Sequence, residues 1–428
     1  MAATTPFASS TETARPAQRT TCLETPSPGQ MTFAARMRHL HTSEIRELLK
    51  LTEQPDVISF AGGLPDPALF PGEALGEILR ELAAQEGAAT LQYGTTAGYG
   101  PLREAIAARL RHTAGLHVDK SQVMITNGSQ QGLDLAGMLF VDPGAPILCE
   151  SPTYLAAINA FRAYEPRFIP VPTDDEGMLP DALAHILARE PDIRMAYVIP
   201  DFQNPTGKTW SRQRREQFMD LISRTRIPVI EDNPYGELRF EGPSQPSLMT
   251  MDPNSQVIGL GTFSKILCPG LRIGWITASP ALLAQFDLLK QGTDLHTAQI
   301  TQACVARYLE RHDLQAHIQT IRETYRRRRD VMLEAIGTHL GDRVSVNRPE
   351  GGLFLWMRLP EGMDARQLLT ACLKQKVAFV PGESFHPQGG HQNTIRLNFS
   401  NASETDIREG ISRISSALDA FHRPAAWV

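Results

Sequence analysis

The chain has 428 residues, of which 42% are hydrophobic and 21% are charged. These fractions are close to the averages of soluble globular proteins, and the length predicts two or three domains, of which we expect two. The formal net charge of −5 provides no basic field, so neither nucleic acid nor a membrane surface is expected as a partner.

The five cysteines lie far apart, and none forms a Cys-x-x-Cys pair typical of a metal or redox site. Reduced thiols in the cytoplasm fit this pattern. No stretch approaches the roughly 18 consecutive apolar residues of a membrane helix, and the N-terminus lacks the apolar core of a secretory signal. The sequence therefore predicts a cytoplasmic protein without a metal site.

Residues 1–30 are rich in Ser, Thr, Pro and Ala and show no apolar periodicity, which predicts a disordered N-terminal extension. From Ser43 the sequence SEIRELLKL places Ile45, Leu48 and Leu49 on one helical face. A loop broken by glycines and prolines, FAGGLPDPALFP, follows this helix.

Between about residues 121 and 280, short β-rich runs alternate with helical stretches: SQVMIT, PILCE, RFIPVP, RMAYVIP, PVIED, QVIGLG and RIGWITA. This alternation predicts an α/β fold with a mixed, mostly parallel seven-stranded sheet between helices. After helices around 281–340, the runs RVSV, GLFLWMRL, VAFVPG and TIRLNF predict a smaller α+β domain. Sheets of the first kind bind ligands in the loops beyond their strand carboxyl ends.

A candidate phosphate site follows the first of these strands, in TNGSQQGLDLAGMLF. The strand ends at Thr126 and a helix begins near Ser129, after the flexible Gly128. Backbone N–H groups and the positive end of such a helix bind phosphate well. A simple strand-to-helix turn, with Ser129 as N-cap, explains the same residues.

A second polar loop is PDFQNPTGKTW, in which Asn204 precedes the turn residues Pro205 and Gly207. Its last part resembles the end of a nucleotide-binding P-loop. That motif needs a glycine five positions before Gly207, where Phe202 stands, so ATP binding is not expected.

The acidic residue Asp232 ends an apolar run in IEDNPYGEL and is followed by Tyr235. An aspartate below a pyridine ring can keep the ring nitrogen protonated, which makes the ring an electron sink. An aspartate at a strand end is also a common turn residue. The sequence alone leaves both interpretations open for Asp232.

The segment GTFSKILCPGLRIGW contains the candidate catalytic residue, Lys265. A lysine amine can condense with an aldehyde cofactor, give way to the amine of the substrate, and then shuttle a proton. Thr262, Ser264 and Arg272 are spaced to add hydroxyl and guanidinium contacts to a phosphate. A lone lysine is usually a solvated charge, so the interpretation depends on these neighbours.

Taken together and in this order, the motifs resemble the fold type I pyridoxal 5′-phosphate (PLP) enzymes, specifically the class I aminotransferases, over about residues 31–425. The resemblance implies that Lys265 carries the cofactor and that Asp232 contacts the ring nitrogen. It implies further contacts for the phosphate, the ring face and the ring 3-oxygen from Gly128, Ser129, Gln130, Tyr154, Asn204, Tyr235, Thr262, Ser264 and Arg272.

The same resemblance assigns two residues outside these loops. Arg396 of TIRLNFS stands where the family binds the α-carboxylate of the substrate, for which a bidentate arginine gives affinity and orientation. Tyr93 of LQYGTTAGYG resembles the tyrosine that reaches the phosphate of the neighbouring subunit. The resemblance therefore implies a homodimer with shared active sites.

Within the class, HTSEIRELLKLTEQP, ISFAGGLPDPALFP and KQGTDLHTA are most similar to the 2-aminoadipate and kynurenine aminotransferases of broad specificity. In that group a mobile helix covers the substrate, and the positions that read its distal carboxylate match Ser43 and Arg46. Gly62 and Gly63 would line the substrate and, like Asn204, contact it. A lid that swings an arginine in or out predicts a broad range of amino acids.

These assignments predict four segments: the extension 1–30, a segment 31–70 that joins the small domain and the lid, a PLP-binding domain 71–310, and a small domain 311–428. The expected reaction moves the amino group of 2-aminoadipate, or of a branched-chain or aromatic amino acid, to 2-oxoglutarate or another 2-oxo acid by a ping-pong mechanism. A PLP-dependent lyase or decarboxylase on the same fold stays open. A PLP-binding transcription regulator would need a DNA-binding domain, for which the first 30 residues show no helix-turn-helix pattern.

Overall fold

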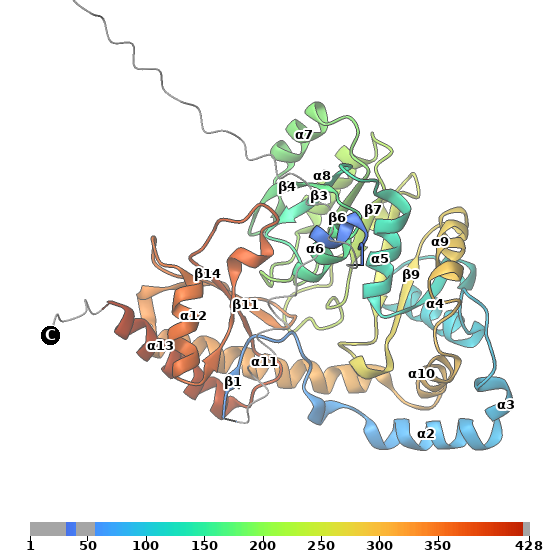
Figure 1. The fold of residues 1–428 in the computed structure, drawn as a ribbon. Helices are drawn as coiled ribbons and strands as arrows, with labels where there is room; N and C mark the ends of the chain where they lie inside the picture. The colour runs from blue at the N-terminus through green and yellow to red at the C-terminus, as the bar shows by residue number, and fades with distance from the viewer. Residues whose placement is uncertain (1–30, 40–55, 423–428) are drawn as a thin grey trace, which may run out of the picture.

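The computed structural model describes residues 31–39 and 56–422. Figure 1 shows a central sheet with helices around it, and a smaller layered region that contains β11 and β14. The long helix α11 (Leu314–His339) runs from the smaller region toward α10 (Gln299–Arg311). The predicted helix from Ser43, and the predicted extension 1–30, lie outside the described residues.

The central sheet has eight strands in the order β2-β9-β8-β7-β6-β3-β4-β5. The seven predicted runs form β2 (Val123–Asn127), β3 (Pro146–Ser151), β4 (Arg167–Asp174), β6 (Met195–Val198), β7 (Val229–Asp232), β8 (Val257–Thr262) and β9 (Ile273–Thr277).

One strand was not expected, because β5 (Gly177–Met178) has only two residues and shows no periodicity. It folds back antiparallel on β4 through a turn that ends at Gly177, where φ is 119°. The strands β4, β3, β6, β7 and β8 are parallel, whereas β9 pairs antiparallel with both β8 and β2. The expected α/β fold with a mostly parallel sheet is thus confirmed.

Hydrophobic cores cover both faces of the central sheet, as the alternation along β6 illustrates. Met195 and Tyr197 pack into one core, and Ala196 and Val198 pack into another, because successive side chains of a strand point to opposite faces. The covering and neighbouring helices are α2 (Gly72–Gln85), α3 (Gly87–Thr90), α4 (Gly100–Ala114), α5 (Ser129–Phe140), α6 (Leu155–Arg162), α7 (Pro180–Arg189), α8 (Arg212–Ile222) and α9 (Pro280–Thr293).

The smaller region is built on a four-stranded sheet in the order β10-β11-β14-β13. Its strands are β10 (Ser345–Val346), β11 (Phe354–Arg358), β13 (Val380–Pro381) and β14 (Thr394–Asn398), and its helices are α12 (Ala365–Lys374) and α13 (Glu404–His422). The short strand β1 (Ile58–Ser59) pairs in parallel with β12 (Val377–Ala378). The early segment therefore lies against the C-terminal part of the chain.

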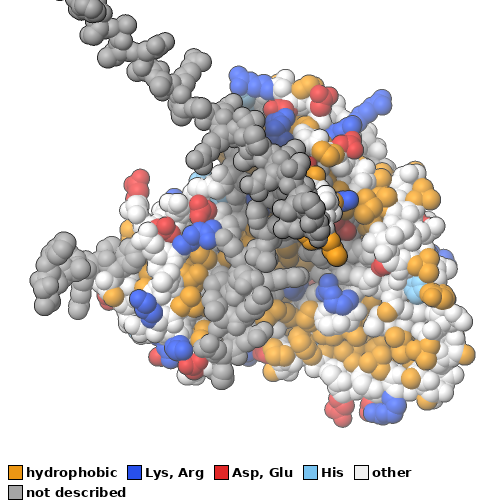
Figure 2. All heavy atoms as spheres, in the orientation of Figure 1, with side chains coloured by type: hydrophobic (Ala, Val, Ile, Leu, Met, Phe, Trp, Pro, Cys, Tyr) orange, Lys and Arg blue, Asp and Glu red, His pale blue; other side chains and the backbone are white. Residues whose placement is uncertain are grey.

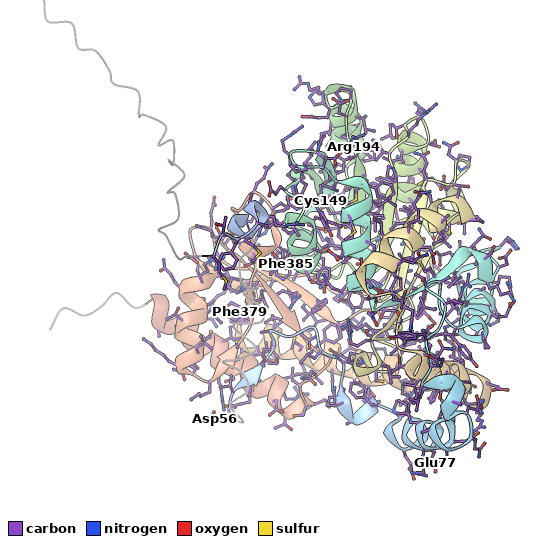
Figure 3. The ribbon with its side chains drawn as sticks, turned by 45° about the vertical axis from the view of Figure 1, so that its right-hand side comes forward. Asp56, Glu77, Cys149, Arg194, Phe379 and Phe385 are labelled. Atoms are coloured by element: carbon purple, nitrogen blue, oxygen red, sulfur yellow. The ribbon has the colours of Figure 1, made fainter. Side chains whose placement is uncertain are left out.

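The two regions meet near the carboxyl ends of the central strands. The backbone N–H of Thr153, just after β3, donates to the carbonyl of Phe385 at 2.9 Å. Figure 3 labels Phe385 on the side of the smaller region that approaches the central sheet, and Cys149 within β3. Among the helices of residues 31–39 and 56–422, none is long and apolar enough to cross a membrane.

Candidate active site

A pocket lies at the carboxyl ends of the central strands, where parallel sheets bind ligands. The parallel register of β7 and β8 places Asp232 beside Leu260, near the end of both strands. Ten residues predicted from the sequence line this pocket together with Ile199 and Pro234: Ser129, Gln130, Tyr154, Asn204, Asp232, Tyr235, Thr262, Ser264, Lys265 and Arg272.

Lys265 reaches into the pocket from the loop after β8. Its Nζ donates to the carbonyl of Gly63 at 2.9 Å, which brings the predicted glycine pair over the lysine. Burial lowers the pKa of Lys265 to about 8, and the positive charges of Arg396 and Arg272 add to this effect. A larger fraction of the amine is therefore neutral, and able to act as nucleophile or base, than for an exposed lysine.

Asp232 ends β7 and is almost fully buried. Its Oδ2 accepts a hydrogen bond from the Tyr197 hydroxyl at 2.9 Å, and its Oδ1 has no partner among the described residues. Burial raises the pKa of Asp232 to about 6, against the lowering effect of the Tyr197 hydrogen bond. An unpaired buried oxygen is costly, so Oδ1 is suited to a positively charged donor in the pocket.

Tyr197 was not predicted as a site residue, because in the sequence it is one aromatic residue within the apolar run RMAYVIP. A buried tyrosine hydroxyl usually has a hydrogen-bond partner, which is the signal that could have identified it. The hydrogen-bond partner, Asp232, lies 35 positions away and could not be predicted from the residues next to Tyr197.

Aromatic and amide side chains also line the pocket. The Asn204 amide hydrogen-bonds to the hydroxyl of Tyr235, whose ring packs edge-on against Phe354 with centroids 5.8 Å apart. Burial raises the pKa of Tyr235, so its hydroxyl stays protonated. Tyr154, at the N-cap position of α6, also lines the pocket. A flat ring would thus have a phenol and an amide at its edge.

The turn before α5 is shaped for a phosphate. Gly128 has φ 71°, and a Cβ there would lie 2.6 Å from Nη2 of Arg272. A Cβ on Gly274 would lie 2.6 Å from the Ser129 nitrogen, so only glycine allows this approach. The N-cap of α5 is Gly128 without a side-chain hydrogen bond, so the interpretation of Ser129 as N-cap is wrong. The first N–H groups of α5 stay available for an anion.

Hydroxyl groups complete the rim of this turn. The Thr262 hydroxyl lies 2.9 Å from the Ser264 hydroxyl and accepts from the Ser264 backbone N–H at 3.1 Å. The Arg272 guanidinium donates from Nη2 to the Asn127 carbonyl at 3.3 Å. Cation, hydroxyl groups and helix N-terminus converge on one place, as a phosphate requires.

Arg396 occupies the middle of β14 and is 1% exposed. Its Nη1 donates to Asn204 Oδ1 at 2.8 Å and its Nη2 to the carbonyl of Ala61 at 2.5 Å. Its Nε has no partner in the described part of the chain. Burial lowers the pKa of Arg396 to about 10. A guanidinium that is held but incompletely paired can still bind a carboxylate.

The surroundings of Arg396 fix its plane. The guanidinium lies over the Phe354 ring at 4.3 Å and over the Phe385 ring at 5.0 Å. The same Phe354 ring would be 3.0 Å from a Cβ on Gly63, and the preceding residue, Gly62, is buried. Phe354 and Phe385 were not predicted as site residues, because their role depends on how β11 and the 3-10 helix Gly382–Phe385 pack around β14.

The predicted residue Tyr93 does not line the pocket. Tyr93 is 78% exposed and packs edge-on against His296, with centroids 5.7 Å apart. Ser43 and Arg46 lie outside the described residues. The contact of Tyr93 with a neighbouring subunit stays a prediction.

These residues fit pyridoxal 5′-phosphate. The α5 turn with Arg272, Thr262 and Ser264 would hold the phosphate, and the unpaired Asp232 Oδ1 suits a protonated ring nitrogen. Lys265 offers a partly neutral amine to the aldehyde.

Comparison with known proteins supports the same assignment. Residues 58–414 match the family of class I and II aminotransferases. The aromatic-amino-acid aminotransferase 1 of Thermococcus litoralis is 45% identical over 390 residues, which cover 90% of this chain and 94% of that protein.

Two solved structures are also similar. A kynurenine aminotransferase of Pyrococcus horikoshii, in complex with PMP, has a TM-score of 0.87 and 42% identity, covering 92% of this chain and 98% of that chain. An α-aminoadipate aminotransferase of Thermus thermophilus, complexed with N-(5′-phosphopyridoxyl)-L-leucine, has a TM-score of 0.85 and 39% identity, covering 91% and 97%.

Proposed function

The chain belongs to the class I and II aminotransferases, and from that membership we propose a substrate range and a reaction course. The donors are 2-aminoadipate and branched-chain or aromatic L-amino acids, because the similar proteins carry the names of aromatic-amino-acid, kynurenine and α-aminoadipate aminotransferases. The acceptor is 2-oxoglutarate or another 2-oxo acid, and the two half-reactions follow a ping-pong mechanism. The cofactor expected from the sequence, PLP, is confirmed.

The observation that carries the proposal is the placement of three charged groups around one pocket. Lys265 and Asp232 line it, and Arg396 reaches it through Asn204. When bound, the cofactor supplies an aldehyde that takes up the amino group and a ring that accepts electrons. The chain supplies a base, a counter-charge for the ring and an anchor for the substrate.

Each of these residues has a separate task in the proposed reaction. Arg396 binds the α-carboxylate and thereby orients the substrate Cα–H bond toward Lys265. The neutral Nζ of Lys265 would accept the Cα proton of the substrate and would later give it up again, so that Lys265 acts first as base and then as acid. Asp232 keeps the ring nitrogen protonated, and Tyr197 keeps Asp232 ionised by donating to Oδ2.

A spectroscopic experiment tests the reaction type. The purified protein with PLP is mixed with single L-amino acids without any 2-oxo acid, and the visible absorption of the cofactor is followed. Transamination predicts conversion to the pyridoxamine form with one equivalent of 2-oxo acid released. Release of ammonia or carbon dioxide with the cofactor band returning unchanged would favour the lyase or decarboxylase instead.

The proposed selectors of the distal carboxylate are Ser43 and Arg46. An Arg46→Ala variant should lose kcat/KM for 2-aminoadipate more than for leucine, whereas Arg396→Ala should lose it for both. Because Arg396 contacts a group common to all amino acids, it serves as the matched comparison. Equal losses for the two substrates in the Arg46 variant would rule out its role as selector.

We further propose a homodimer in which Tyr93 completes the active site of the partner. Tyr93, its neighbour Leu91 (71% exposed) and Leu295 (47% exposed) present apolar surface around His296. Figure 2 shows hydrophobic side chains gathered on the side where Figure 1 draws α2 and α10. Such exposed apolar area favours association.

A mixing experiment tests the shared site. Lys265→Ala and Tyr93→Ala variants are each expected to be impaired. Dimers formed from both should regain activity at one of two sites, since that site has an intact lysine and an intact tyrosine. A monomer in analytical ultracentrifugation, or no recovery on mixing, would contradict the shared dimer.

The proposed domain division is a cofactor-binding domain over 71–310 and a small domain over 311–428, joined by residues 31–70. The pairing of β1 with β12 and the position of α11 support it. A cytoplasmic location is supported by the four cysteines of the described residues, which are all free thiols.

A further inference from the structure

A fully buried lysine lies beside the phosphate turn but outside the pocket. Lys290 is on α9, which packs next to α5 in Figure 1, and its side chain is 0% exposed. Its Nζ donates to both carboxylate oxygens of Asp294, at 2.8 and 2.9 Å, and to Gln131 Oε1 at 2.8 Å. All three ammonium protons are thereby used, so Lys290 does not itself bind the cofactor.

The groups that satisfy Lys290 also hold the turn before α5. The side-chain amide of Asn127, the last residue of β2, donates to Asp294 Oδ2 at 2.5 Å. The backbone N–H of Asn127 donates to Gln131 Oε1 at 2.9 Å, and Gln131 Nε2 donates to Asp294 Oδ2 at 2.7 Å. On its other side, the Asn127 carbonyl accepts from Arg272. The turn is therefore fixed from two directions.

Stability alone gives little reason for this ion pair. The free-energy cost of removing two charges from water offsets most of the attraction between them. Apolar side chains of similar volume often give a fold equal stability. Burial lowers the pKa of Lys290, and the carboxylate of Asp294 opposes that effect. An apolar pair, however, could neither accept the Asn127 amide nor orient Gln131. The ion pair thus provides geometry that packing cannot provide.

We propose that Lys290 and Asp294 are positioning residues that set the turn of residues 127–129 for the cofactor phosphate. The inference rests on the PLP site of the proposed function and adds two residues of α9 and its C-cap to it. A small displacement of the turn would lengthen the hydrogen bonds from the α5 N-terminus to the phosphate, which act only at short range.

The test separates PLP affinity from stability in the apoenzyme. Asp294→Leu should lower the free energy of unfolding, since it leaves Lys290 buried without its partner. Lys290→Met/Asp294→Leu should recover part of that loss, yet should bind PLP about tenfold more weakly than wild type. Asn127→Ala leaves the ion pair intact and should also weaken PLP binding about tenfold, with a smaller loss of unfolding free energy than Asp294→Leu.

Three measurements read the result: the PLP dissociation constant from equilibrium dialysis, the ³¹P chemical shift of bound PLP, and urea unfolding of the apoenzyme. Arg212→Met is the matched control, because Arg212 and Glu216 form an exposed i,i+4 pair on α8. Its PLP affinity and ³¹P shift should equal those of wild type.

Two results would overturn the inference alone: wild-type PLP affinity in both Asn127→Ala and the double variant, or an affinity that follows unfolding stability across all variants. Failure of the wild-type chain to bind PLP would instead overturn the proposed function, and this inference with it. The two failures are distinguishable because the first leaves PLP binding by the wild-type chain intact, whereas the second abolishes it.

Discussion

Replacing Asp232 with asparagine should stabilise the apoenzyme at neutral pH. Burial raises the pKa of Asp232 from 3.8 to about 6, so the folded chain binds its proton more tightly than the unfolded chain. Keeping the carboxylate ionised at pH 7 therefore costs the fold about 3 kcal/mol. Asparagine removes this cost, and the expected gain in unfolding free energy is up to about 3 kcal/mol.

The sign of the pH dependence makes the prediction specific. Because the folded pKa is the higher one, the cost is complete above pH 6 and disappears as the pH falls toward 3.8. Urea unfolding of both apoenzymes, followed by circular dichroism at pH 7.5 and at pH 4.5, should show a gain that shrinks at the lower pH. PLP binding should weaken, since the charge that holds the ring nitrogen is lost.

A second buried aspartate provides the control with the opposite sign. Asp201 accepts from both Nη atoms of Arg215, at 2.9 and 3.2 Å, and the arginine side chain is 0% exposed. Asp201→Asn should therefore lose about 3–5 kcal/mol at pH 7.5, because it leaves a buried guanidinium charge uncompensated. If Asp232→Asn lost stability at pH 7.5 as Asp201→Asn does, or gained equally at both pH values, the reasoning would be refuted.

Three further predictions concern the pocket. Tyr197→Phe removes the hydrogen bond that favours ionised Asp232 and should raise the pKa of Asp232. The rate of the half-reaction, followed by stopped-flow absorption, should therefore begin to fall at a higher pH on acidification than in the wild type. An unchanged pH dependence would contradict this. The rate of PLP capture by the apoenzyme should rise about tenfold per pH unit and level near the pKa of Lys265, about 8, whereas a rise continuing past pH 9.5 would indicate an ordinary lysine. Gly128→Ala should weaken PLP binding in equilibrium dialysis far more than Gly144→Ala, since both have positive φ but a Cβ meets a guanidinium only at Gly128. Similar losses would assign the effect to backbone strain alone.

Local sequence determined the strands and the loops of the site. The runs that became β2, β3, β4, β6, β7, β8 and β9 have continuous apolar stretches, which are typical of strands buried on both faces. Because parallel strands end at one edge, the polar residues directly after them were expected to meet there. Asp232, Lys265 and Ser129 do line one pocket, for this reason.

Tertiary structure decided which of these groups are paired and which are left free. Arg396 meets the carbonyl of Ala61, 335 positions away, and Lys265 meets that of Gly63 across 202 positions. Tyr197 takes one oxygen of Asp232 and leaves the other without a partner among the described residues. No periodicity along the chain encodes such contacts, because they depend on how separate elements pack. The sequence alone determined the kind of chemistry, whereas burial and long-range contacts determined the pKa values and orientations that enable it.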